Sequence, residues 1–140
     1  MTLKHQWITR EIIGAAFEVY RILGYGFLEK VYQRAMQVEL SRRGLLAQME
    51  HPIKVDFKGI RVGYFKADLF VEHKVIVEIK VAKQYNVNDE AQLLNALKAK
   101  LLINALKATH IEVGLLINFG RTKVEFKRRV FSDPSAFHPR

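Results

Sequence analysis

The spacing of apolar residues changes along the chain, and these changes constrain its fold more than any other feature. Apolar residues recur every three or four positions from Thr2 to Leu23 and from Phe27 to Arg43, which predicts two helices. Gly24 and Gly44 follow these segments, at the positions where helices commonly end. Because only three residues join the two helices, we expect them to pack antiparallel.

A period of two, which is typical of half-buried strands, follows in the middle of the chain. Strands are predicted for Pro52–Lys58, Arg61–Val71, Val75–Val81, Glu112–Asn118 and Lys123–Val130, and a long helix for Asp89–Thr109 with Asn88 as its N-cap. The expected fold class is therefore α/β, with the order α-α-β-β-β-α-β-β and a mixed sheet covered by helices. Without any linker or shift in composition, we expect a single domain over residues 1–140, with residues 131–140 as a loose tail.

The predicted third helix contains a tandem repeat. The segment Leu93–Ala99 recurs nine residues later as Leu102–Ala108, with one conservative difference. At about 100° per residue, nine residues advance a helix by about 900°, so the two copies place their apolar faces on opposite sides. Such a helix must be buried all round, bulge, or find a partner. We therefore expect a homo-oligomer that associates through Leu93–Ala108.

Net charge and composition narrow the classes of partner. The chain has 23 Lys and Arg against 14 Asp and Glu, a net charge of +9 that favours nucleic acid first and an anionic membrane surface second. Because no helix pairs a basic face with a bulky apolar one, we expect no membrane partner. The absence of cysteine excludes disulfides, Cys-ligated metals and thiol nucleophiles. With no signal peptide at the N-terminus and no apolar run of spanning length, we expect a soluble, cytoplasmic protein.

A cluster of basic residues near the C-terminus is predicted to contact the nucleic-acid backbone, although a solvated strand face is the alternative. The cluster consists of Arg121, Lys123, Lys127, Arg128 and Arg129.

Two neighbouring strands carry the strongest candidate for chemistry. If the turn between them centres on His73, paired residues sum to 146, and Asp68 lies opposite Glu78 with β-carbons about 5 Å apart. Two carboxylates this close repel each other unless a cation lies between them, which favours a divalent metal such as Mg²⁺ or Mn²⁺. Lys80, on the same face, then points at a phosphate or at the attacking water. A two-residue turn would move Glu78 to the other face, and an exposed charge pair on a strand edge is the alternative interpretation.

Several motifs occur in the order found in one known family. They are Gly26–Tyr32, which fits G-x-x-E-x-x-Y, then Ala67–Leu69, Val77–Lys80, Glu90–Asn95 and Gly114–Gly120. Over about Ile8 to Val130 the chain resembles the GxxExxY protein family of the PD-(D/E)xK nuclease superfamily. The resemblance implies a restriction-endonuclease-like core.

The resemblance also implies roles for individual residues. Asp68 and Glu78 would ligate the metal, Lys80 would assist the nucleophilic water, Glu29 would complete the metal shell through water, and Gln92 would be a supporting polar residue. Glu29 as a helix-dipole partner and Gln92 as a hydrogen-bond donor to a loop are the alternatives. Glu18, one helix earlier, is another acid that could approach the site, but the favoured interpretation is a structural or surface residue.

This chain departs from the family in one helix and at the residue directly before Asp68. Ala96 stands where relatives tend to have an aromatic residue, and the repeat falls in the same helix. Ala67 replaces a common proline.

The predicted function is that of a metal-dependent nuclease with Mg²⁺ or Mn²⁺ as cofactor, acting on DNA rather than RNA. The alternative is a non-catalytic module of the same fold that binds nucleic acid or protein.

Overall fold

The structure is a computed structural model that describes residues 4–81 and 88–131, and side chains in the third helix from Leu97 onward. Its elements are α1 (Gln6–Leu23), α2 (Glu29–Arg42), β1 (Ala47–Phe57), β2 (Ile60–Val71), β3 (Val75–Val81), α3 (Asn88–Thr109), β4 (Val113–Phe119) and β5 (Val124–Val130). This is the α-α-β-β-β-α-β-β order that the periodicity predicts.

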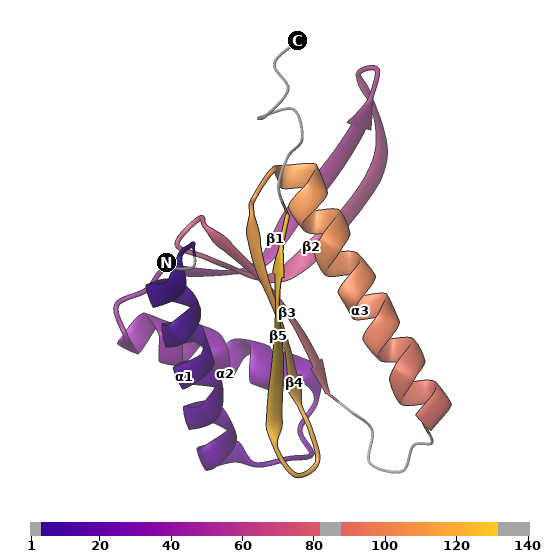
Figure 1. The fold of residues 1–140 in the computed structure, drawn as a ribbon. Helices are drawn as coiled ribbons and strands as arrows, with labels where there is room; N and C mark the ends of the chain where they lie inside the picture. Colours follow the sequence, from indigo (N-terminus) through magenta and orange to yellow (C-terminus); the bar gives the residue numbers. More distant parts are fainter. Residues whose placement is uncertain (1–3, 82–87, 132–140) are drawn as a thin grey trace.

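The strands form a five-stranded mixed sheet in the order β1-β2-β3-β4-β5. Strands β3 and β4 are parallel and are connected through α3, whereas every other neighbouring pair is antiparallel. Figure 1 shows α1 and α2 together on one side of the sheet, α3 on the other, and the β1–β2 hairpin extending beyond the other strands. The fold class is therefore the predicted mixed α/β sheet covered by helices.

Each face of the sheet has its own apolar core, as alternation along the strands requires. Ile12 and Leu40 of the first two helices pack with Val77 on one face. Leu102 and Leu106 of α3 pack with Ile76, the neighbour of Val77 along β3, on the other. Among the described residues, no helix is long and apolar enough to cross a membrane.

Three predicted boundaries were wrong by more than one residue for identifiable reasons. Helix α1 begins at Gln6 and not at Thr2, since His5 directly before it has a left-handed φ of +53°. Strand β1 begins at Ala47 and not at Pro52, which lies within the strand and pairs with Lys66. Because β1 is an edge strand, a proline that lacks an N–H is tolerated there. Helix α2 begins at Glu29 and not at Phe27, because the backbone of Leu28 is extended and Gly26 has a φ of +114°, outside the helical region.

The remaining boundaries agree closely with the predictions. Helix α3 begins one residue before the expected start, and β4 and β5 begin one residue after it. Gly44 has φ +81° directly after α2, as expected for a left-handed helix end. Residues 132–140, the predicted tail, lie outside the described residues.

The two copies of the repeat in α3 face opposite directions, as the half-turn offset predicts. Leu106 of the second copy is fully buried, whereas its equivalent in the first copy, Leu97, is 55% exposed. The second copy also lies close against β4, because a Cβ on Gly114 would come within 2.6 Å of Leu102 Cδ1. The second copy is therefore the one that packs on the sheet.

This difference predicts unequal effects of the same substitution in the two copies. We expect Leu106→Ala to lower the free energy of unfolding by about 2–5 kcal/mol, since it opens a cavity in the core. Leu97→Ala is the matched control and should change it by less than about 0.5 kcal/mol. Urea denaturation of both variants measures this, and equal losses would contradict the observed packing of α3.

Candidate active site

Asp68 and Glu78 meet across the β2–β3 hairpin. The pairs Leu69–Val77, Phe70–Ile76 and Val71–Val75 sum to 146, which confirms the register predicted from a turn centred on His73. The turn residues Glu72 and His73 both have positive φ, as a tight three-residue connection requires. Continued by one step, this register sets Asp68 opposite Glu78, and both side chains are buried.

Asp68 is held in place from two sides. Its Oδ2 atom accepts a hydrogen bond of 2.7 Å from the backbone N–H of Ile79. Its backbone carbonyl accepts a second, of 2.8 Å, from the Nε2 atom of Gln33, a buried residue of α2. The sequence analysis did not single out Gln33, although a glutamine within the buried positions of a helix is a signal for a buried polar contact.

The G-x-x-E-x-x-Y motif forms the start of α2. Tyr32 is fully buried, stacks on Phe119 with ring centroids 4.5 Å apart, and donates a 2.5 Å hydrogen bond to the carbonyl of Gly24. Its hydroxyl also accepts a 3.3 Å hydrogen bond from the N–H of Phe27. Tyr32 therefore secures the loop that precedes Glu29, the first residue of α2, and so sets where the Glu29 carboxylate lies.

A lysine that the sequence analysis did not assign to the site joins these carboxylates. The Nζ atom of Lys98 in α3 lies 2.9 Å from Glu29 Oε1, 3.4 Å from Asp68 Oδ2 and 3.9 Å from Glu78 Oε2. Its side chain is only 13% exposed. The half-turn offset of the repeat was a usable signal, because it implies that only one of Lys98 and Lys107 faces the sheet, and Lys107 is exposed.

Burial and neighbouring charges shift the pKa values of Glu78 and Lys98. Burial, followed by the charge of Asp68, raises the pKa of Glu78 to about 9, with Lys98 acting in the opposite sense. Burial lowers the pKa of Lys98, but the charges of Asp68, Glu29 and Glu78 outweigh it and the net shift is upward. At neutral pH Glu78 is therefore protonated, and the ion pairs of Lys98 are those with Glu29 and Asp68, in keeping with the longer distance to Glu78.

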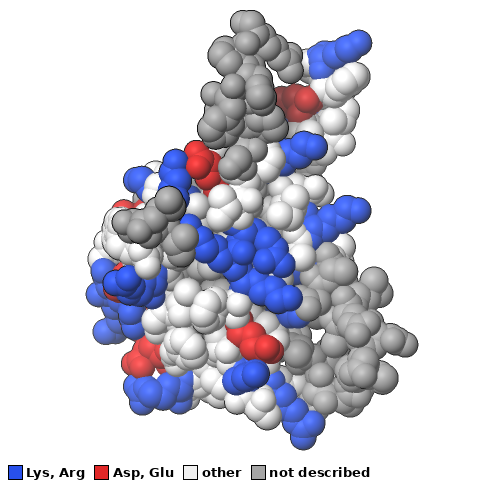
Figure 2. Space-filling view, in the orientation of Figure 1, with Lys and Arg blue, Asp and Glu red and all other residues white. Residues whose placement is uncertain are grey.

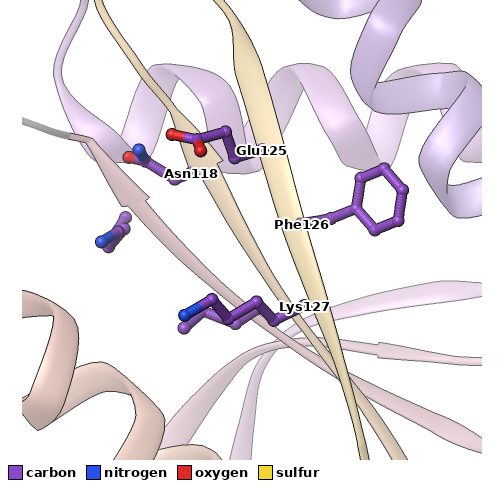
Figure 3. Close-up of a pocket in the computed structure, with 6 residues that line it drawn as sticks. Asn118, Glu125, Phe126 and Lys127 are labelled. Carbon is purple, nitrogen blue, oxygen red and sulfur yellow. The ribbon is translucent and has the colours of Figure 1, made fainter.

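Lys80 lies on the same face as Glu78 and lines a separate small cavity. The cavity has a volume of about 160 Å³ and is bounded by Lys80, Leu116, Asn118, Glu125, Phe126 and Lys127. Figure 3 shows Asn118, Glu125 and Lys127 projecting to one side of β5 while Phe126 points away. Burial lowers the pKa of Lys80. The charge of Glu125 acts in the opposite sense, and the charge of Lys127 lowers the pKa further. In the described part of the chain, the carboxyl groups of Asp68 and Glu78 lie within 4 Å of the Lys98 ammonium, and neither forms an ion pair with Lys80.

The five basic residues predicted to bind nucleic acid do not share one face. Lys127 and Arg129 pair with Leu116 and Gly114 and lie on the α3 side of β5, whereas Arg128 lies on the α1 side. The Arg128 guanidinium donates hydrogen bonds to Thr9 Oγ1 and to the carbonyl of Lys4, so it ties the start of α1 to β5. Two more, Arg121 and Lys123, are exposed at the β4–β5 turn. Figure 2 shows Lys and Arg side chains gathered near the middle of the face on which β5 lies.

The remaining candidate residues are Gln92 and Glu18. Gln92 lies outside the residues whose side chains the structure describes. Glu18 is ion-paired with Arg21 on α1 at 2.8 Å, which agrees with its interpretation as a surface residue.

The carboxyl groups of Glu29, Asp68 and Glu78 suit a hard divalent cation, although they do not form a complete metal site in this structure. Carboxylate oxygens are the ligands that Mg²⁺ and Mn²⁺ prefer. Glu78 Oε1 is buried with no hydrogen-bond partner in the structure, so it is available as a ligand. In the part of the chain that the structure describes, no three His, Asp or Glu side chains form a metal-binding group as they stand. The carboxylates of Glu29, Asp68 and Glu78 instead surround Lys98.

The raised pKa of Glu78 predicts how stability depends on pH in metal-free protein. Between the ordinary glutamate pKa of 4.5 and about 9, the folded chain holds a proton that the unfolded chain loses. The free energy of unfolding should therefore fall as pH rises through this window, by at most about 1.4 kcal/mol per pH unit for one proton. Lys98 titrates above the window. Urea denaturation in EDTA at several pH values should give a flatter profile for Glu78→Gln than for wild type, and parallel profiles would contradict the assignment.

Comparison with known proteins identifies the superfamily of this chain. The profile of the PD-(D/E)XK nuclease superfamily matches residues 6–129. No curated protein matches the chain. Among solved structures, the crystal structure of SSO0001 is similar, with 15% sequence identity and a TM-score of 0.49 over 94% of this chain. The chain spans 62% of the length of that protein. Since the superfamily profile covers nearly every element that builds the site, the chain belongs to the PD-(D/E)XK nuclease superfamily.

Proposed function

We propose that the protein is a divalent-metal-dependent nuclease that hydrolyses phosphodiester bonds of DNA. The observation that carries this proposal is the pair of buried carboxyl groups of Asp68 and Glu78, set face to face by the β2–β3 register in a member of a nuclease superfamily. Within that superfamily, the G-x-x-E-x-x-Y motif around Glu29 supports the GxxExxY family.

Asp68 and Glu78 would hold Mg²⁺ or Mn²⁺ directly, and Glu29 would reach it through water. When bound, the ion would neutralise phosphate charge and lower the pKa of a bound water. The hydrogen bond from the Ile79 N–H holds Asp68 in one orientation, so little reorganisation is needed when the site is filled.

The cations beyond the carboxylates support a phosphate ligand. Lys80 and Lys127 border the same cavity, and burial leaves the Lys80 ammonium poorly solvated, which favours binding of an anion there. Lys80 would orient the scissile phosphate and stabilise the charge that develops on it. Arg129, on the same side of β5, and the turn residues Arg121 and Lys123 would contact the backbone without reading sequence.

Cleavage assays test the proposal directly. Supercoiled, linear and single-stranded DNA should be cut with Mg²⁺ or Mn²⁺, and Glu78→Gln should reduce the rate by about 10²–10³-fold or more. Lys80→Ala should also reduce it, because the phosphate loses its buried cation. Glu18→Gln is the control, since Glu18 is on α1 and paired with Arg21. Equal cutting by wild type and Glu78→Gln would contradict the assignment.

A non-catalytic nucleic-acid-binding module is the second candidate, and the ion pairs of Lys98 favour it. An ammonium that satisfies Glu29 and Asp68 removes the electrostatic need for a metal. This candidate requires salt-sensitive DNA binding with no cleavage and no Mn²⁺ site that depends on Asp68.

We also propose that the chain self-associates through the first copy of the repeat. Leu97 is 55% exposed on the side of α3 opposite to the packed Leu106. Light scattering at micromolar concentration should give the mass of a dimer for wild type and of a monomer for Leu97→Lys, because a charge cannot be buried in an apolar contact. Ile22→Lys, at a position 64% exposed on α1, is the control and should remain dimeric. A monomeric wild type would contradict the proposal.

A further inference from the structure

A buried ammonium group lies where the proposed function requires a metal ion. Lys98 Nζ is within 2.9–3.9 Å of oxygen atoms from Glu29, Asp68 and Glu78, which are the three acids proposed to bind the metal. These residues come from α2, β2 and β3, so the contact joins α3 to both the sheet and the opposite helical layer. Such convergence on one cation is unlike an exposed surface ion pair.

The repeat explains why a lysine is found there. Lys98 precedes Leu102 by four residues, so both lie on the face of α3 that packs on the sheet. Leu102 is fully buried and lies against Gly114, which shows that the second copy occupies this packing position. Lys107, the equivalent of Lys98 in the second copy, is exposed.

Counting back by the length of the repeat shows what the arrangement changes. With the second copy packed on the sheet, Lys98 lies at the carboxyl groups of the site. The residue nine positions earlier in the sequence is Asp89. Packing of the second copy thus presents an ammonium where packing of the first copy would present an acid.

We propose that Lys98 is the residue that sets the metal affinity of this site, because its ammonium competes with the divalent ion for Glu29 and Asp68. The inference rests on the proposed function, and it concerns affinity and not the chemical step. Lys98 holds the carboxylates in the metal-free protein, and the ion enters only as the ammonium leaves.

The two cations exclude each other for geometric and electrostatic reasons. A metal of this type lies about 2.0–2.1 Å from its oxygen ligands. An ion bound to the Asp68 carboxylate would therefore lie close to the ammonium, which is 3.4 Å from Oδ2, and would place a double positive charge beside it. Without Lys98, the Asp68 carboxylate, whose side chain is only 13% exposed, would keep its negative charge beside the partly exposed Glu29, which strengthens the attraction for a metal ion.

Titration with Mn²⁺, followed by electron paramagnetic resonance, tests this without reference to activity. We expect Lys98→Gln to bind Mn²⁺ about tenfold more tightly than wild type or better. Lys98→Arg keeps the charge and should bind about as weakly as wild type. Lys107→Gln, the same change in the other copy of the repeat, is the matched control and should leave the affinity unchanged.

The outcomes separate this inference from the proposed function. If wild type binds Mn²⁺ and Lys98→Gln binds no more tightly, the role of Lys98 is overturned while the metal site stands. If neither protein binds Mn²⁺ although both are folded, the metal site itself fails and both proposals fall. Tighter binding that disappears in the double variant Lys98→Gln/Asp68→Asn supports both.

A measurement on wild type remains decisive even if the variant does not fold. Amine-reactive labelling followed by mass spectrometry should modify Lys98 slowly in EDTA, because its side chain is 13% exposed and ion-paired. Saturation with Mn²⁺ should increase labelling at Lys98 several-fold and leave labelling at the exposed Lys107 unchanged. Unchanged labelling of Lys98 at saturating Mn²⁺ would overturn the proposal.

Discussion

The burial of two carboxyl groups next to each other is the constraint on which the rest of this structure depends. Asp68 and Glu78 lie next to each other within the sheet, where burial and the charge of Asp68 both raise the pKa of Glu78. Several surrounding groups offset this cost. The Ile79 N–H binds Asp68, a proton is retained on Glu78, and Lys98 supplies a positive charge. In this arrangement protein groups compensate the two carboxyl groups, whose oxygen atoms are the kind of ligand that a divalent metal prefers.

The elements around this pair act as its supports. Gln33 binds the backbone of Asp68 from α2, and Tyr32 secures the loop that brings Glu29 to the same place. The G-x-x-E-x-x-Y motif thus has a structural part and a part in the site. Its tyrosine is buried under the sheet, and its glutamate reaches the other carboxyl groups. Helix α3 closes the site from the opposite layer (Figure 1).

The repeat in α3 links packing to chemistry. A helix can pack only one of two opposed apolar faces on the sheet, and Leu106 shows which one is chosen. That choice exposes Leu97 and turns Lys98 inward at the same time. The choice of which copy packs on the sheet therefore determines which side chain of α3 reaches a site that lies on other strands and another helix.

Local sequence patterns determined much of this protein. Periodicity indicated every helix and strand, and turn length determined that Asp68 faces Glu78, because side chains alternate along paired strands. Tertiary structure decided what the patterns leave open. The repeat alone makes its two copies equivalent, and only packing against Gly114 distinguishes Lys98 from Lys107. Similarly, the alternation of side chains along a strand places Arg128 and Lys127 on opposite faces of β5. Only the position of α1 explains why Arg128 binds Thr9. Short-range spacing governs elements and register, whereas the partners of a charged side chain depend on which surfaces fold against each other.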